Sequence, residues 1–246
     1  MCQCTHSPGK PPLFDLLKVP NYTMPTLNLS AFKYPLGIIR VVEFLFIVIA
    51  IAAVNSWGIT LTYNCPNNST HKAEVSTFSL GGATIEDCKN SSSHLWTSGD
   101  SSTGSAGFFY FVNVTALIYV LVIMFVYVVF WPLYQSEKRV ALADLSFTAL
   151  FFILFFFCSA SWWAGSNNLG HATSEERITE LMNSSDAFWK VNTENTDLSL
   201  ARDTSNGKLV ISVLSDWVCV FVFAMNCWFV WKEVVPKSNQ NPSQIA

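Results

Sequence analysis

Residues 151–157 read FFILFFF, and no Asp, Glu, Lys or Arg occurs between Asp144 and Glu175. A helix built from such residues has no polar face, whereas a helix on the surface of a soluble protein normally has one. On insertion scales a charge at the centre of a bilayer costs about 2.5–3.5 kcal/mol, and about twenty apolar residues are enough to cross the bilayer. This stretch therefore predicts a transmembrane helix.

Three further stretches of the chain lack charged residues in the same way. They lie between Glu43 and Lys72, between Asp100 and Glu137, and between Asp216 and Lys232. Lipid offers no hydrogen-bond partner to an open backbone, so helices are the expected form of a span. We predict an all-α membrane protein, a four-transmembrane-helix bundle, with spans at about 36–58, 108–133, 142–164 and 209–231.

The composition agrees with this class of protein. Hydrophobic residues make up 51% of the chain and charged residues 13%, which favours a lipid-embedded chain over a soluble domain. The net charge of -3 comes without a basic cluster, so no nucleic acid partner is indicated.

Basic residues indicate the orientation of the spans. The N-terminal segment, the short loop at residues 134–141 and the C-terminal tail carry them at higher density than the two long loops, which places both termini in the cytoplasm. Four glycosylation sequons agree, because they fall in the loops that are then lumenal: Asn67, Asn68, Asn90 and Asn183. Sequons at Asn21 and Asn28 argue the other way.

The first long loop contains two of the seven cysteines, Cys65 and Cys88. A cysteine pair in a lumenal segment predicts a disulfide, which by closing a loop of about 24 residues would stabilise the fold by roughly 3 kcal/mol. The alternative is two free thiols. Between these cysteines, a weak alternation around Gly81 and Gly82 predicts a short hairpin, and residues 175–182 of the second long loop predict a short amphipathic helix.

Arg40 and Glu43 are charged residues inside the first predicted span. They are three residues apart on one helix face and close enough to pair, and the simplest interpretation is an anchor for the cytosolic end of the helix. Asp144 begins the third span, where it can face either the bundle interior or cytosolic water.

Asp216 is the charged residue that the sequence places deepest. It lies roughly 12 Å into the fourth span, where it should face protein or water, near Asn55 or Asn113 of neighbouring helices. The alternative is a span that begins later and leaves Asp216 at the interface.

Groups for catalysis are not evident in the sequence. The four histidines are isolated and lie outside the spans, and no Ser, His and Asp arrangement or phosphate-binding glycine loop is present. We expect no catalytic residue, no metal site and no cofactor, and therefore no enzyme.

Four segments together resemble the synaptophysin family (synaptophysin, synaptoporin, pantophysin and mitsugumin), vesicle proteins with a MARVEL-type membrane domain. They are Tyr34–Val41 (YPLGIIRV), the Cys65 and Cys88 pair, Ser159–Gly165 (SASWWAG) and Asn226–Glu233 (NCWFVWKE). The chain departs from that family in lacking a second cysteine pair in the second long loop and in having a short tail after Glu233.

The resemblance implies a division of the chain into three parts. A largely irregular cytoplasmic segment (1–35) precedes a MARVEL-like four-span domain (36–233) with lumenal loops at about 59–107 and 165–208, and a short cytoplasmic tail (234–246) follows. It also implies a function in small transport or secretory vesicles of the synaptic type, in membrane organisation, trafficking and exocytosis. The implied partners are cholesterol-rich lipid, further copies of the chain and a synaptobrevin-type vesicle SNARE.

Two other functions fit four spans. A channel-forming or transport oligomer is suggested by Asp216 and the intramembrane asparagines. A junctional tetraspan like claudin is suggested by the disulfide loop, but the closely spaced cysteines after a Gly-Leu-Trp run that mark claudins are absent.

Overall fold

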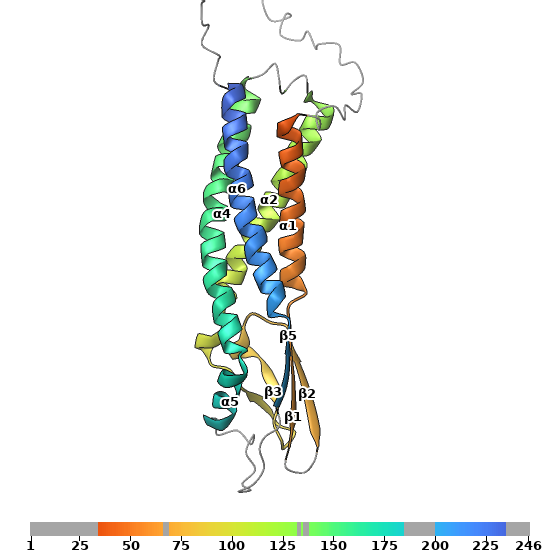
Figure 1. Ribbon diagram of the computed structural model, residues 1–246, viewed down its shortest axis with the longest axis vertical. Helices are drawn as coiled ribbons and strands as arrows, with labels where there is room; N and C mark the ends of the chain where they lie inside the picture. Colours follow the sequence, from red (N-terminus) through yellow and green to blue (C-terminus); the bar gives the residue numbers. More distant parts are fainter. Residues whose placement is uncertain (1–33, 66–68, 132–133, 135–137, 185–199, 235–246) are drawn as a thin grey trace, which may run out of the picture.

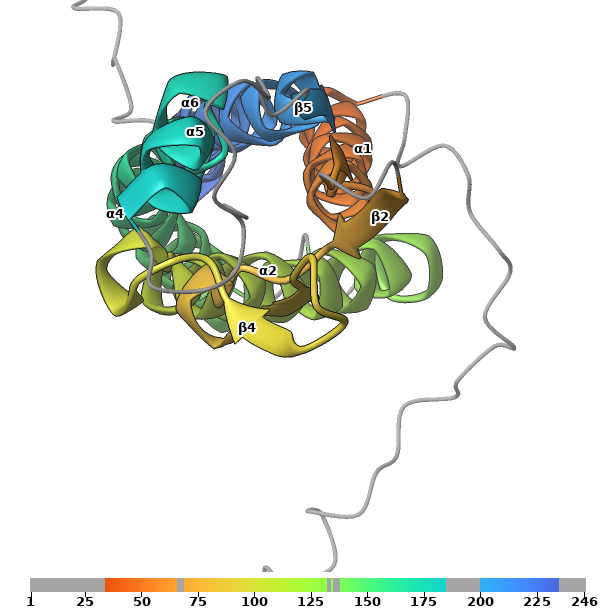
Figure 2. The same ribbon diagram turned by 90° about the horizontal axis from the view of Figure 1, so that it is seen from below.

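Four long helices form the bundle in the computed structural model, which describes residues 34–65, 69–131, 134, 138–184 and 200–234. They are α1 (Pro35–Asn55), α2 (Thr103–Val129), α4 (Lys138–Ala172) and α6 (Asn206–Val234), and they lie side by side (Figure 1). α1 and α4 each pack against both α2 and α6, so the helices close into a ring (Figure 2). Within the described chain these four helices are long and apolar enough to cross a membrane, which confirms the predicted bundle.

The helix ends differ from the predicted span ends for local reasons. α1 begins at Pro35, where a proline is tolerated because the first N–H groups of a helix have no partner within it. α4 continues past the predicted end at residue 164 to Ala172, since Leu169 and Ala172 are buried against the loops beyond the bundle. α2 likewise starts at Thr103, before the predicted 108.

The two long loops fold together into a cap on one end of the bundle, formed by the described parts of residues 59–100 and 173–204 (Figure 1). β1 (Ile59–Asn64) lies between β2 (Thr70–Val75) and β5 (Leu200–Thr204), and both pairs are antiparallel. Ile59, Leu61 and Tyr63 of β1 alternate into the core. Because β5 comes from the second loop, the sheet joins segments far apart in the chain.

Smaller elements complete the cap. β3 (Thr84–Glu86) pairs with β4 (Ser92–His94), two short 3-10 helices follow Ser79 and Thr97, and α5 (Glu175–Ser184) packs three apolar side chains inward. α5 confirms the predicted amphipathic helix. The predicted hairpin around Gly81 and Gly82 is wrong, because these residues form a 3-10 helix and lie between the two hairpins of this loop, β1–β2 and β3–β4. At Gly81 a Cβ atom would lie 2.6 Å from the Thr97 carbonyl oxygen, so the backbone approaches too closely for a side chain.

Cys65 and Cys88 form a disulfide, as predicted. The bond joins the residue after β1 to the turn after β3, so it fastens the sheet to the smaller β3–β4 pair. Cys158 and Cys219 are free and fully buried in the bundle.

Candidate functional site

Arg40 of α1 is completely buried and is held by two carboxylates. Its Nη1 donates to Glu43 Oε2 at 2.8 Å, and its Nη2 donates to Asp144 Oδ1 at 2.5 Å. The predicted pairing of Arg40 with Glu43 is therefore present. The pair is more than an anchor for one helix end, because the second carboxylate comes from α4.

Asp144 faces the bundle interior, the first of its two predicted environments. Its Oδ2 accepts hydrogen bonds from Tyr127 and Tyr134, at 2.9 and 2.8 Å, and its Oδ1 accepts one from Tyr119 at 2.5 Å. α4 begins six residues earlier, so Asp144 lies nearly two turns inside the helix, opposite the tyrosines of α2. Three phenol O–H groups thus solvate a carboxylate that water does not reach.

Glu43 extends the same network to the fourth helix. Asn226 Nδ2 of α6 donates to Glu43 Oε1 at 2.8 Å. Thr148 of α4 accepts a further hydrogen bond from Arg40 at 2.8 Å. We call the following set the Arg40 network: Arg40, Glu43, Tyr119, Tyr127, Tyr134, Asp144, Thr148 and Asn226. All four long helices contribute to it.

The balance between desolvation and charge pairing determines how the Arg40 network contributes to the bundle. Removing an ion from water costs several kcal/mol even inside a relaxed protein, and a buried pair recovers this only when the remaining polar atoms are bonded. Here one guanidinium faces two carboxylates, and tyrosine and asparagine donors bond the carboxylate oxygens, while Arg40 Nε and Asn226 Oδ1 have no hydrogen-bond partner among the described residues. The arrangement specifies how four apolar helices fit together, which apolar packing alone does poorly in lipid.

Part of this network was visible in the sequence and part was not. Arg40 and Glu43 stand out because they are charged within a span. Tyr119 and Tyr127 are eight residues apart, so they lie on one face of α2, and that spacing with Asp144 at the start of the next span is a usable signal. Asn226 is a polar residue within the fourth span, but its local sequence does not indicate that it bonds to Glu43.

Asp216 of α6 forms a second buried polar site, nearer the cap. Its side chain is completely buried and faces protein, as predicted, whereas its depth relative to the membrane interface stays a prediction. α6 starts at Asn206, which puts Asp216 about 15 Å along the helix. Asn113 Nδ2 of α2 donates to Oδ1 at 3.2 Å, and the thiol of Cys158 of α4 donates to Oδ2 at 3.6 Å.

The neighbours of this Asp216 site differ from those predicted in one respect. Asn113 is one of the two asparagines expected near Asp216. Asn55, the other, instead accepts a hydrogen bond from Tyr110 at 2.6 Å. Throughout the described chain no Lys or Arg side chain forms an ion pair with Asp216.

The cap contains carboxylates in a different setting. Burial alone would raise the pKa of Asp100, but hydrogen bonds from the Thr97 hydroxyl and N–H, together with Arg177 of α5, hold it below the usual value. Burial likewise opposes ionisation of Asp87, yet the N–H groups of Ser91 and Lys89 keep its pKa low. These carboxylates are ionised at neutral pH and fasten the turns of the cap.

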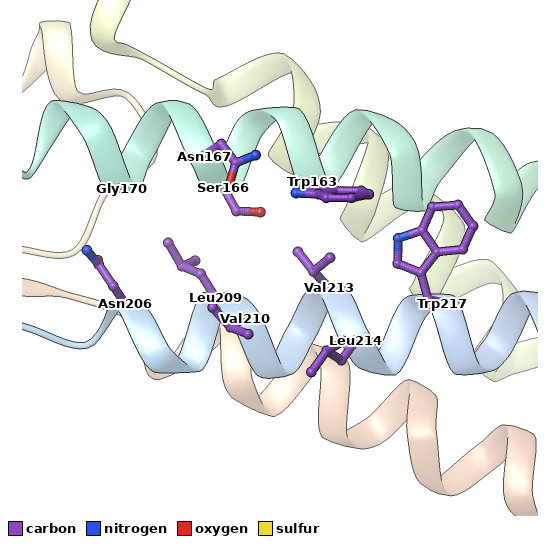
Figure 3. Close-up of a pocket in the computed structure, with 10 residues that line it drawn as sticks. All are labelled: Trp163, Ser166, Asn167, Gly170, Asn206, Leu209, Val210, Val213, Leu214 and Trp217. Atoms are coloured by element: carbon purple, nitrogen blue, oxygen red, sulfur yellow. The ribbon is translucent and has the colours of Figure 1, made fainter.

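A groove lies between α4 and α6 at the end of the bundle next to the cap (Figure 3). Its volume is about 500 Å³, and aliphatic side chains and two tryptophans line most of it. Trp163 of α4 and Trp217 of α6 stand at one end, and Asn167 and Asn206 lie toward the other (Figure 3).

The predicted glycosylation sites fall partly within the described residues. Asn90 follows β3 and Asn183 lies near the end of α5, and both side chains are exposed on the cap. Asn67 and Asn68 lie outside the described residues.

A comparison with protein families agrees with this architecture. The model of the MARVEL membrane-associating domain matches residues 31–229, which include α1, α2, α4, the whole cap and all of α6 except its last five residues. The match covers most of the 246 residues. This chain therefore belongs to the MARVEL membrane-associating domain family and is a multi-pass membrane protein with four candidate spans.

Proposed function

We propose that this chain is a synaptophysin-like protein of small transport or secretory vesicles, with a structural role in organising the vesicle membrane during trafficking and exocytosis. The observation that carries the proposal is the Arg40 network. Its charged groups lie on α1 and α4 and are hydrogen-bonded by neutral side chains of α2 and α6, so they serve the fit of the bundle. A non-enzymatic, structural role needs such a bundle and needs no reactive group.

The outer surface of the bundle supports lateral packing in a membrane. Large apolar side chains on each of the four helices are exposed, among them Ile38, Phe111, Phe157 and Phe221. Such faces suit lipid and equally suit further copies of the chain. Cholesterol-rich lipid and a synaptobrevin-type SNARE are the partners expected from the resemblance of the four segments to the synaptophysin family.

Vesicle isolation tests the proposal directly. A C-terminally tagged chain, captured on intact membranes from secretory cells, should bring down small vesicles that contain a synaptobrevin-type SNARE. Confinement of the tagged chain to plasma-membrane junctions would contradict the vesicle role.

Topology is tested on the same membranes. If the cap is lumenal, a tag on either terminus is cleaved by added protease while the cap is protected, and glycosidase increases gel mobility. The variants Asn90→Gln and Asn183→Gln should each remove one glycan if that site is used. Digestion of the cap in sealed vesicles would contradict the proposed orientation.

A channel-forming or transport oligomer is the second candidate, and the Asp216 site is the observation that favours it. An intramembrane carboxylate often marks an ion pathway. Purified protein in planar bilayers should then conduct, and Asp216→Asn should change the conductance. An electrically silent parent protein that is correctly folded would remove this candidate.

A further inference from the structure

Asp216 differs from the other buried carboxylates of the bundle in having no basic partner among the described residues. Each neighbouring helix contributes a different group. α2 provides the amide of Asn113 and α4 the thiol of Cys158, while Cys219 lies one turn further along α6. The nearest carboxylate of α1 is Glu43, which is already bonded to Arg40 and Asn226. A negative charge on Asp216 would therefore stand uncompensated.

Asn113 supplies an independent observation at the same place. Its side chain is completely buried, and its Nδ2 points at Asp216, yet its Oδ1 has no hydrogen-bond donor among the described residues. Buried amide oxygens are rarely left without a donor. A proton bound between the amide and the carboxyl group would supply this donor.

We infer that Asp216 is a proton-binding site within the membrane, and that its carboxylic O–H donates to the unpaired amide oxygen of Asn113. A neutral carboxylic acid and a primary amide each offer a donor and an acceptor, so they satisfy one another. The step is the addition of one proton to a carboxylate oxygen and breaks no other bond. It removes the uncompensated charge and the unpaired acceptor together.

The position of this proton has a mechanical consequence. Asn113, Cys158 and Asp216 lie on three different helices, α2, α4 and α6. Loss of the proton would place a bare charge among these helices and would loosen their contact on the side of the cap. The inference does not depend on the vesicle role, since it concerns the bundle alone.

Infrared difference spectroscopy tests it on the full-length protein in lipid. The C=O stretch of a protonated carboxyl is separate from the bands of ionised carboxylates. At neutral pH the parent should show a protonated-carboxyl band that Asp216→Asn lacks. The control variant Asp100→Asn should retain the band, because Asp100 is ionised. Equal spectra for the parent and Asp216→Asn would overturn the inference.

A chemical probe gives a second readout that does not depend on how the variant folds. Dicyclohexylcarbodiimide enters membranes and adds to protonated carboxyls, so it should label Asp216 of the parent, as identified by mass spectrometry. Labelling should fall about tenfold for each pH unit above the point of half-protonation. Protection by sodium and not by choline, at fixed pH and ionic strength, would show a metal ion in place of the proton and would overturn the inference.

Discussion

The Arg40 network and the Asp216 site hold buried carboxylates in the same bundle but surround them differently. Glu43 and Asp144 share a guanidinium and accept hydrogen bonds from tyrosine and asparagine side chains. Asp216 meets an amide and a thiol, both neutral. The difference teaches that a membrane bundle can accommodate an acid by supplying a counter-charge or, as we infer for Asp216, by leaving the acid neutral.

Removing the counter-charge should have the largest effect. Arg40→Met keeps most of the aliphatic stem but removes the guanidinium, which leaves two buried carboxylates without a cation, and we expect a loss of about 3–5 kcal/mol in the free energy of unfolding. Reversible unfolding in lipid-detergent mixtures measures it. Adding Glu43→Gln and Asp144→Asn to Arg40→Met should recover much of the loss, because no unpaired charge remains. A triple variant as unstable as Arg40→Met would show that the arginine acts through packing.

The cap provides a hydrogen-bonded carboxylate outside the bundle, Asp100, against which both sites of the bundle can be compared. The folded-state pKa of Asp100 is lower than its unfolded value, so its stabilising contribution is complete above about pH 4 and is lost as the pH falls below that value. We expect acid to weaken the cap by about 1–2 kcal/mol through this residue.

This loss of stability is measured by thermal unfolding between neutral pH and about pH 3, with the exposure of the cap as the signal. Asp100→Asn should reduce the pH dependence of the stability of the cap and should leave the Arg40 network unaffected. An unchanged acid response in Asp100→Asn would assign the effect to other groups.

Removing a single hydrogen-bond donor of the Arg40 network should lower the free energy of unfolding by less than removing Arg40 does. Tyr127→Phe removes one hydrogen bond to Asp144 and should lower the free energy of unfolding by about 1–2 kcal/mol, because the ionised acceptor loses a donor. Tyr110→Phe is the matched control, since its hydroxyl bonds to the exposed Asn55. Equal effects of the two variants would contradict a special role for the buried phenol.

Asp216→Asn should have the smallest effect. An asparagine has nearly the shape and polarity of a protonated aspartic acid, so we expect a change of less than about 1 kcal/mol in the free energy of unfolding. Asp144→Asn, the corresponding change in the Arg40 network, should destabilise by more, because it removes a partner of Arg40. If Asp216→Asn destabilised the protein more than Asp144→Asn, the inferred difference in charge between the two sites would be wrong.

Much of the bundle could be predicted because the relevant signals are local. The absence of charge between Asp144 and Glu175 predicts a span without reference to any other part of the chain. The pairing of β1 with β5 could not be predicted in this way. These strands are more than a hundred residues apart, and neither carries a mark of its partner. The hairpin around Gly81 and Gly82 was misassigned because short alternation is weak evidence when a tight contact with Thr97 determines the backbone.

The sequence by itself determined four membrane helices, the disulfide partners and the presence of charged groups within three of the spans, because lipid penalises charge and open backbone wherever they occur. Only the tertiary structure decided which groups meet. It placed Asp144 against Arg40, and it placed Asp216 against Asn113 with no cation. The reason is geometric: the free energy of a buried charge depends on the atoms within a few ångströms, and in a ring of helices those atoms come from distant parts of the chain.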